Sequence, residues 1–102
     1  MDKIAALREI LQLDPSNAFA RYGLAMEHLS QGNTEAALAD FNALMVQQPD
    51  YVPAYQMSAQ TLARTGQTAA AIAILNDGIA AAQRTGNQHA ASEMQGLLNE
   101  LH

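Results

Sequence analysis

The stretch SQGNTEAALADF, residues 30–41, ends one helical pattern at Gly32 and begins another within two residues. Residues 64–75, RTGQTAAAIAIL, repeat this arrangement around Gly66, which lies 34 residues after Gly32. A fixed period of this length is typical of stacked supersecondary units. The sequence therefore predicts two similar helical hairpins, each with its bend at a glycine. The hairpins must stack, because one helix pair cannot cover its own apolar face.

Prolines and a third glycine extend this division along the chain. Pro15 and Pro49 are also 34 residues apart, and helices are expected to end near both because the residue before a proline disfavours helix. Pro53 is allowed in the first turn of a fourth helix, and Gly86 is expected just after the end of a fifth. Residues 88–101 form the sixth helical segment, and no segment shows the period-two alternation of a strand.

Polar residues mark the expected helix starts. We expect N-caps at Ser16 or Asn17, at Asn33 or Thr34, and at Thr68. These side-chain oxygens can accept hydrogen bonds from the free amides of a first helical turn. Together with the breakers, they predict about six helices joined by short turns.

Composition limits the functions that this chain can perform. The chain has 102 residues, 49% of them hydrophobic, and no cysteine, so it can form one close-packed domain without disulfides or thiolate sites. The net charge of −5 repels phosphate backbones and anionic membranes, and the five basic residues are dispersed, so neither nucleic acid nor membrane is an expected partner. The longest apolar run, residues 69–75, is far short of the roughly 20 residues of a membrane span. We expect a cytoplasmic protein.

The repeat resembles that of the tetratricopeptide repeat (TPR) family, in which each helix pair has small, aromatic and proline residues at fixed places. The matching residues of the first hairpin are Leu24, Ala25, His28, Ala37, Phe41 and Pro49, and those of the second are Tyr55, Ser58, Ala59, Leu62, Ala71 and Leu75. The resemblance implies an all-α fold, an α-solenoid of antiparallel helix pairs that forms a right-handed superhelix. It divides a single domain into a half repeat (1–16), two repeats (17–50 and 51–84) and a capping helix (85–102).

Three residues depart from the family pattern. Arg21 stands where the family prefers a large apolar residue, and His28 replaces an aromatic one. We expect His28 to be a packed, hydrogen-bonded core residue. Gln83 stands where a third proline would fall, so the fifth helix can continue past this point.

Small residues recur where the paired helices should cross. Ala25 and Ala37 in the first hairpin correspond to Ala59 and Ala71 in the second. Alanine at these places lets two helix axes approach closely, and larger side chains beside them can fill the remaining space.

The second helix is apolar on two faces. At about 100° per residue, the first stripe consists of Phe19, Tyr22, Met26 and Leu29. The second stripe, centred more than about 90° away, consists of Leu24, Ala25 and His28. A surface helix needs only one apolar face, so either both stripes are buried or one of them binds a partner. The family resemblance places the first stripe towards a concave groove, where aromatic residues and methionine can anchor a peptide or helix.

The fourth helix has polar residues at the equivalent positions. Gln56, Gln60 and Arg64 could hydrogen-bond a peptide backbone or a carboxylate, or they could form a solvated face. Some TPR domains hold a partner's C-terminal carboxylate with Lys, Asn and Arg on the inner face. Tyr22 and Met26 occupy matching places here, so that arrangement is not expected.

The chain shows no pattern typical of an enzyme or a metal protein. Its histidines, at positions 28, 89 and 102, include no pair at helical spacing. The acidic residues, Asp40 and Asp50 among them, are scattered and fit solvated helix faces. We therefore expect no catalytic residue, no cofactor and no metal.

Two functions remain open. The first is a protein–protein interaction module or scaffold that binds a protein or peptide of unknown identity in a groove built from the second, fourth and sixth helices. The alternative is a self-associating homodimer or larger homo-oligomer, because Ile4, Leu7, Ile10 and Leu11 of the first helix lack a front-half partner. A piece of a larger scaffold that serves an enzyme in trans is a third option, although the initial methionine favours a complete small protein.

Overall fold

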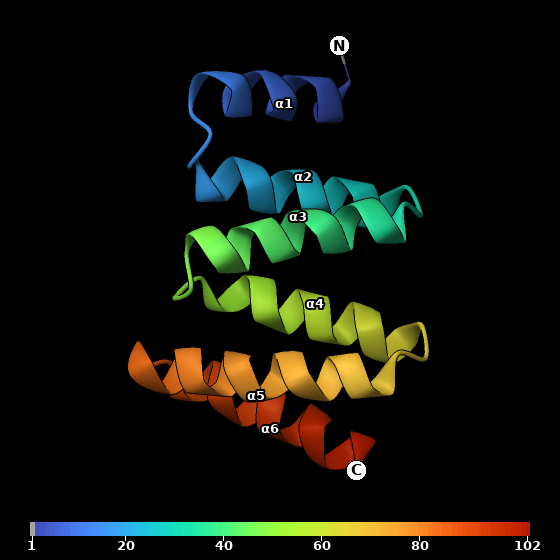
Figure 1. The fold of residues 1–102 in the computed structure, drawn as a ribbon, viewed down its shortest axis with the longest axis vertical. Helices are drawn as coiled ribbons and strands as arrows, with labels where there is room; N and C mark the ends of the chain where they lie inside the picture. The colour runs from blue at the N-terminus through green and yellow to red at the C-terminus, as the bar shows by residue number, and fades with distance from the viewer. Residues whose placement is uncertain (1) are drawn as a thin grey trace. The chain divides into compact units, whose positions relative to one another are not determined.

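A computed structural model describes residues 2–102, which form two compact units that meet in sequence between Gln48 and Pro49. Unit 1, ending at Gln48, contains α1 (Lys3–Leu13), α2 (Ala18–Ser30) and α3 (Thr34–Gln47). Unit 2, beginning at Pro49, contains α4 (Val52–Arg64), α5 (Thr68–Arg84) and α6 (Gln88–Leu101) (Figure 1). Residues 2–102 contain no strand. The predicted all-α fold of six helices is confirmed.

Glycines form the bends of the hairpins, as predicted. Gly32 and Gly66 have φ angles of 79° and 80°, in the left-handed region that favours glycine. In both turns the amide after the glycine donates to the carbonyl five residues earlier, at 2.8 Å. This bond completes the glycine-terminated helix end in which free carbonyls are satisfied by the turn. Gly86, with φ 73°, repeats the geometry between α5 and α6.

The helix starts agree only in part with the expected caps. The Asn17 side chain accepts a bond of 2.8 Å from an amide of the first turn of α2, as predicted. Asn33 occupies the cap position of α3, but its side chain makes no capping bond. The predicted cap at Thr68 is wrong, because α5 begins at that residue and Gln67 precedes it. The Gln67 carbonyl already accepts the first helical bond from the Ala71 amide at 3.0 Å.

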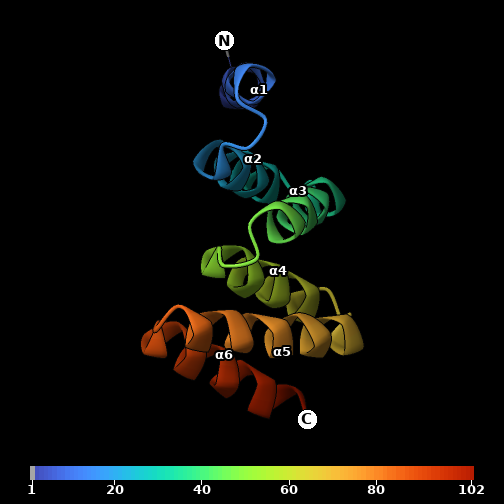
Figure 2. The same cartoon turned by 60° about the vertical axis from the view of Figure 1, so that its left-hand side comes forward.

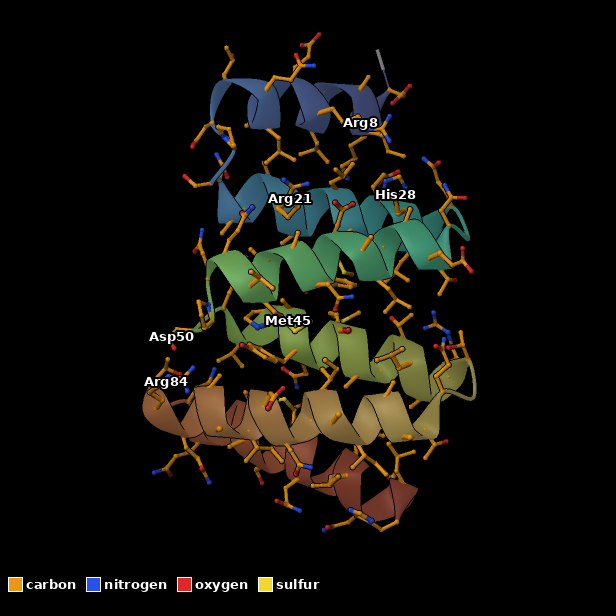
Figure 3. All side chains as sticks on the ribbon, viewed as in Figure 1. Arg8, Arg21, His28, Met45, Asp50 and Arg84 are labelled. Atoms are coloured by element: carbon orange, nitrogen blue, oxygen red, sulfur yellow. The ribbon has the colours of Figure 1, made fainter. Side chains whose placement is uncertain are left out.

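The length of α5 brings its end to the turn before α4. With Gln83 in place of a proline, α5 continues to Arg84 and reaches 17 residues. Arg84 Nε donates to Asp50 Oδ1 at 2.7 Å and Arg84 Nη2 donates to the Pro49 carbonyl at 3.2 Å (Figure 3). The same carbonyl accepts the Tyr55 hydroxyl at 2.8 Å. These bonds connect the turn at the start of unit 2 with α4 and with the C-terminal end of α5.

In unit 1, α2 contacts both α1 and α3 (Figure 2). Leu11 of α1 forms a buried cluster with Ala20 and Leu24 of α2. Ile4 and Leu7 pack against this cluster from α1. The half repeat at the N-terminus is thus attached through one apolar face to the following helix.

The helix crossings are lined by the small residues that the repeat predicts. Four alanines have no exposed surface: Ala25, Ala37, Ala59 and Ala71. The larger residues beside them, Phe41 and Leu75, are also fully buried. Side chains of one methyl group let the helix axes approach, and the larger neighbours fill the space that remains.

Gly78 makes a crossing that the repeat did not predict. A Cβ atom at this position of α5 would lie 2.6 Å from Tyr55 Cβ on α4 and 2.7 Å from Met94 Sδ on α6. Real Cβ atoms do not make contacts this short. All three helices of unit 2 therefore meet at a point where there is no room for a side chain.

The buried Tyr55 phenol gives unit 2 a stability that depends on pH. Burial raises the pKa of Tyr55, and the neighbouring Arg84 opposes this effect in part. The folded state therefore holds the phenol proton more tightly than the unfolded chain. This contribution to stability is complete below the unfolded pKa of about 10 and is lost as the pH rises through the folded pKa.

We predict that Tyr55→Phe makes the free energy of unfolding less sensitive to pH above about 10, because phenylalanine has no proton to lose. The measurement is urea unfolding followed by circular dichroism on either side of this pH. The other ionisable groups are common to both proteins, so they cancel in the comparison. Parallel pH profiles for wild type and variant would contradict the assignment.

Candidate functional site

The predicted peptide-binding stripe of α2 is partly accessible. Phe19 is 81% exposed, and Tyr22, Met26 and Leu29 are half-buried. The Tyr22 ring lies against α3, with its centroid 6.0 Å from that of Phe41 and the two planes tilted by 57°. This separation is within the range of favourable aromatic pairs. The stripe is therefore held at its middle by packing and presents Phe19 to solvent.

The second apolar face of α2 is buried. Leu24, Ala25 and His28 are at most 6% exposed. Helix α2 thus uses this face for packing, which accounts for one of its two apolar stripes. The first stripe is not needed in full for the core, since its largest side chain, that of Phe19, is mostly in solvent.

The predicted polar positions of α4 are in different environments. Gln60 and Arg64 are exposed. Gln56 is half-buried, and its Nε2 donates to Glu93 Oε1 on α6 at 3.3 Å. The same Glu93 oxygen lies 3.0 Å from His89 Nε2, one helical turn earlier on α6. This connection between α4 and α6 could not be predicted from the sequence, because nothing in the local spacing brings Gln56 near Glu93.

The environment of Asp40 differs from the sequence-based expectation. We expected this carboxylate on a solvated face, but its side chain is only 14% exposed. Arg21 Nη1 on α2 donates to Asp40 Oδ1 at 3.1 Å, and His28 Nε2 lies 3.7 Å from Asp40 Oδ2. His28 is buried, as predicted, but its Nδ1 has no hydrogen-bond partner among residues 2–102. The departures of Arg21 and His28 from the family pattern marked these two positions in the sequence, but nothing in the local spacing pairs them with Asp40.

Residues 2–102 contain no group of three or more His, Cys, Asp or Glu side chains placed to hold a metal ion. None of the helices in this range combines the length and the apolar character that crossing a membrane requires.

Comparison with known proteins assigns the family. The sequence model of the tetratricopeptide repeat family matches residues 28–97. The chain belongs to the tetratricopeptide repeat family. A TPR repeat-containing protein of Pseudomonas aeruginosa is 28% identical to it over 98 residues, which are 96% of this chain and 93% of that relative.

Solved structures show the same TPR fold. The solution structure of a TPR domain protein from Salinibacter ruber is 37% identical, with a TM-score of 0.82 over 87% of this chain and 90% of that one. The TPR2B domain of yeast Sti1, in complex with pHsp70, has a TM-score of 0.87 at 21% identity, over 96% of this chain and 78% of that one. At 21% identity, the similarity to the Sti1 domain shows the fold alone. The predicted solenoid of antiparallel helix pairs is confirmed.

Proposed function

We propose that this TPR protein is an interaction module that binds a peptide or helix of a partner protein through the stripe formed by Phe19, Tyr22, Met26 and Leu29. The exposed Phe19 carries the proposal. A large aromatic side chain that is 81% exposed contributes little to the fold, whereas it can bury a large apolar area against a partner. Aromatic residues are common anchors of protein interfaces.

The rest of the stripe supports the same role. Met26 and Leu29 continue the apolar surface along α2 for about two turns from Phe19. A surface of this shape suits the apolar face of an amphipathic helix or alternate side chains of an extended peptide. The fold of the Sti1 domain, solved with pHsp70, is a precedent for a protein ligand on this scaffold.

On unit 2, α4 offers a polar surface for a partner segment. Gln60 and Arg64 are exposed and can donate to backbone carbonyls or a carboxylate. Gln56 would first have to exchange its bond to Glu93. The proposed activity is binding without catalysis.

The proposed stripe can be tested with alanine substitutions of two apolar residues that have nearly the same exposure. Phe19→Ala and Val46→Ala each remove a side chain about four-fifths exposed, 81% and 80%, but only Phe19 belongs to the stripe. Peptides selected from a random displayed library against the wild type serve as ligands. We expect Phe19→Ala to raise their Kd by about tenfold, as loss of an interface anchor does. Val46→Ala should leave Kd within about twofold, as for a surface position outside the contact.

Equal effects of the two substitutions on Kd would contradict the proposed stripe. Thermal unfolding of both variants is the control for stability, and we expect only small changes because neither side chain is part of the core.

A second candidate function, self-association, is favoured by α1. Leu13 is 90% exposed and Ile10, one turn earlier, is 43% exposed. These two large apolar residues lie next to each other on the surface of α1 and could pack against a second copy of the chain.

For this candidate we predict a concentration-dependent dimer that Leu13→Gln weakens, because the substitution puts an amide into the apolar contact. Sedimentation velocity over a range of protein concentrations measures the dimer. A wild type that sediments as a monomer throughout would exclude self-association, and so would a dimer that Leu13→Gln leaves unchanged.

A further inference from the structure

Unit 1 has an open cavity of about 480 Å³ between its three helices. Its lining includes Arg8 of α1 and Arg21 and His28 of α2, which Figure 3 labels. Leu11, Leu24, Ala36, Ala39 and Asp40 also line it. The volume is within the range of small-ligand sites. On α2 the lining residues are centred roughly 150° away from the stripe, at about 100° per residue. The cavity is therefore separate from the surface assigned to the partner peptide.

The cavity is basic in an acidic protein. The chain has only five lysine and arginine residues and a net charge of −5, yet two of its arginines, Arg8 and Arg21, line this cavity. Asp40 is the only carboxylate in the lining, and it pairs with Arg21. Arg8 is exposed, with no carboxylate within 4.0 Å among residues 2–102. Within residues 2–102, the Arg8 guanidinium therefore has no carboxylate partner and faces solvent.

Buried polar atoms in the lining also lack partners. Arg21 Nε and His28 Nδ1 are both buried with no hydrogen bond inside residues 2–102. His28 as a whole is only 6% exposed. Both atoms have almost no accessible surface, so they lie behind the cavity surface, and a ligand in the cavity would contact the outer nitrogens of these side chains instead. The protein keeps polar groups here that an apolar contact would not need.

The same residues are the departures from the family pattern. Arg21 stands in place of an apolar residue and His28 in place of an aromatic one. Both lie next to Asp40 in the cavity lining. Apolar side chains at these places would bring neither charge nor hydrogen-bonding groups to the cavity. This chain instead combines charged residues with small ones, Ala36 and Ala39, which leave the cavity open.

We propose that this cavity binds the carboxylate of a ligand that carries an apolar group next to it. The guanidinium groups of Arg8 and Arg21 hold the carboxylate, as arginine forks do. Leu11 and Leu24, with the two alanines, form an apolar wall for the neighbouring group. A carboxylate brings one negative charge to one unmatched guanidinium, whereas a phosphate group carries up to two and is repelled more strongly by Asp40.

The test titrates the isotope-labelled full chain with N-acetyl-L-leucine, which has one carboxylate beside an apolar side chain. We expect saturable shifts of the backbone amides of Leu11, Leu24, Ala36 and Ala39 in NMR spectra. N-acetyl-L-leucinamide keeps the side chain but has no charge, and we expect it to bind at least about tenfold more weakly. No saturable shift up to the solubility limit, equal binding of the amide, or stronger binding of inorganic phosphate would overturn the proposal.

A pair of matched variants locates the site. Arg8→Gln and Arg64→Gln remove the same charge from two exposed arginines, but only Arg8 lines the cavity. We expect Arg8→Gln to raise the Kd for N-acetyl-L-leucine by about fivefold or more, and Arg64→Gln by less than about twofold. Equal effects would overturn the assignment, since they would indicate attraction by overall charge alone.

The carboxylate could belong to a free acid or to the C-terminus of a polypeptide. Titration with N-acetyl-glycyl-glycyl-leucine distinguishes these sources. Tighter binding of the tripeptide supports a polypeptide terminus that leaves through the open side of the cavity, and equal binding supports a free acid. Weaker binding of the tripeptide also supports a free acid, with a cavity that excludes the extra residues.

Discussion

The close approach of helices at small residues is the constraint on which the rest of the structure depends. Ala25 and Ala37 in unit 1, and Ala59 and Ala71 in unit 2, have no exposed surface at all. At Gly78 even a single methyl group would come within 2.6 Å of Tyr55. Protein interiors are packed at the density of organic crystals, so such contacts fix how the helices lie within each unit. With only 5% aromatic residues in the chain, alanines make up nearly half of the buried hydrophobic residues.

This way of packing leaves α2 with an accessible apolar stripe, while its buried face borders an open cavity. Because Leu24, Ala25 and His28 satisfy the core, Phe19 remains in solvent and the stripe behind it is only half-buried. At the margin of the buried face of α2, Arg21 joins Asp40 at the edge of an open cavity that Leu24 and His28 also line. The same helix can therefore serve an apolar partner segment and a charged small group independently, with different physical chemistry at each.

The helices could be predicted from sequence because their signals are local. Gly32 and Gly66 require a left-handed backbone, and this fixes the bends regardless of what packs around them. The cavity could not be predicted, because it depends on residues from three helices meeting in space. Arg21 and His28 were visible as departures from the pattern, but no local rule pairs them with Asp40. The exposure of Phe19 is likewise a property of tertiary packing, which periodicity alone does not determine.

A comparison of two glycine substitutions tests the close-packing account most directly. Gly78→Ala and Gly96→Ala each add one methyl group inside a helix, but nothing lies within 4 Å of the new atom at Gly96. Replacing glycine by alanine favours a helix by about 0.5–1 kcal/mol, so Gly96→Ala should raise the free energy of unfolding by that amount. Gly78→Ala should lower it, because overpacking typically costs about 1–3 kcal/mol and exceeds the gain. Urea unfolding of both variants measures the difference. Equal stabilisation by the two substitutions would contradict the account.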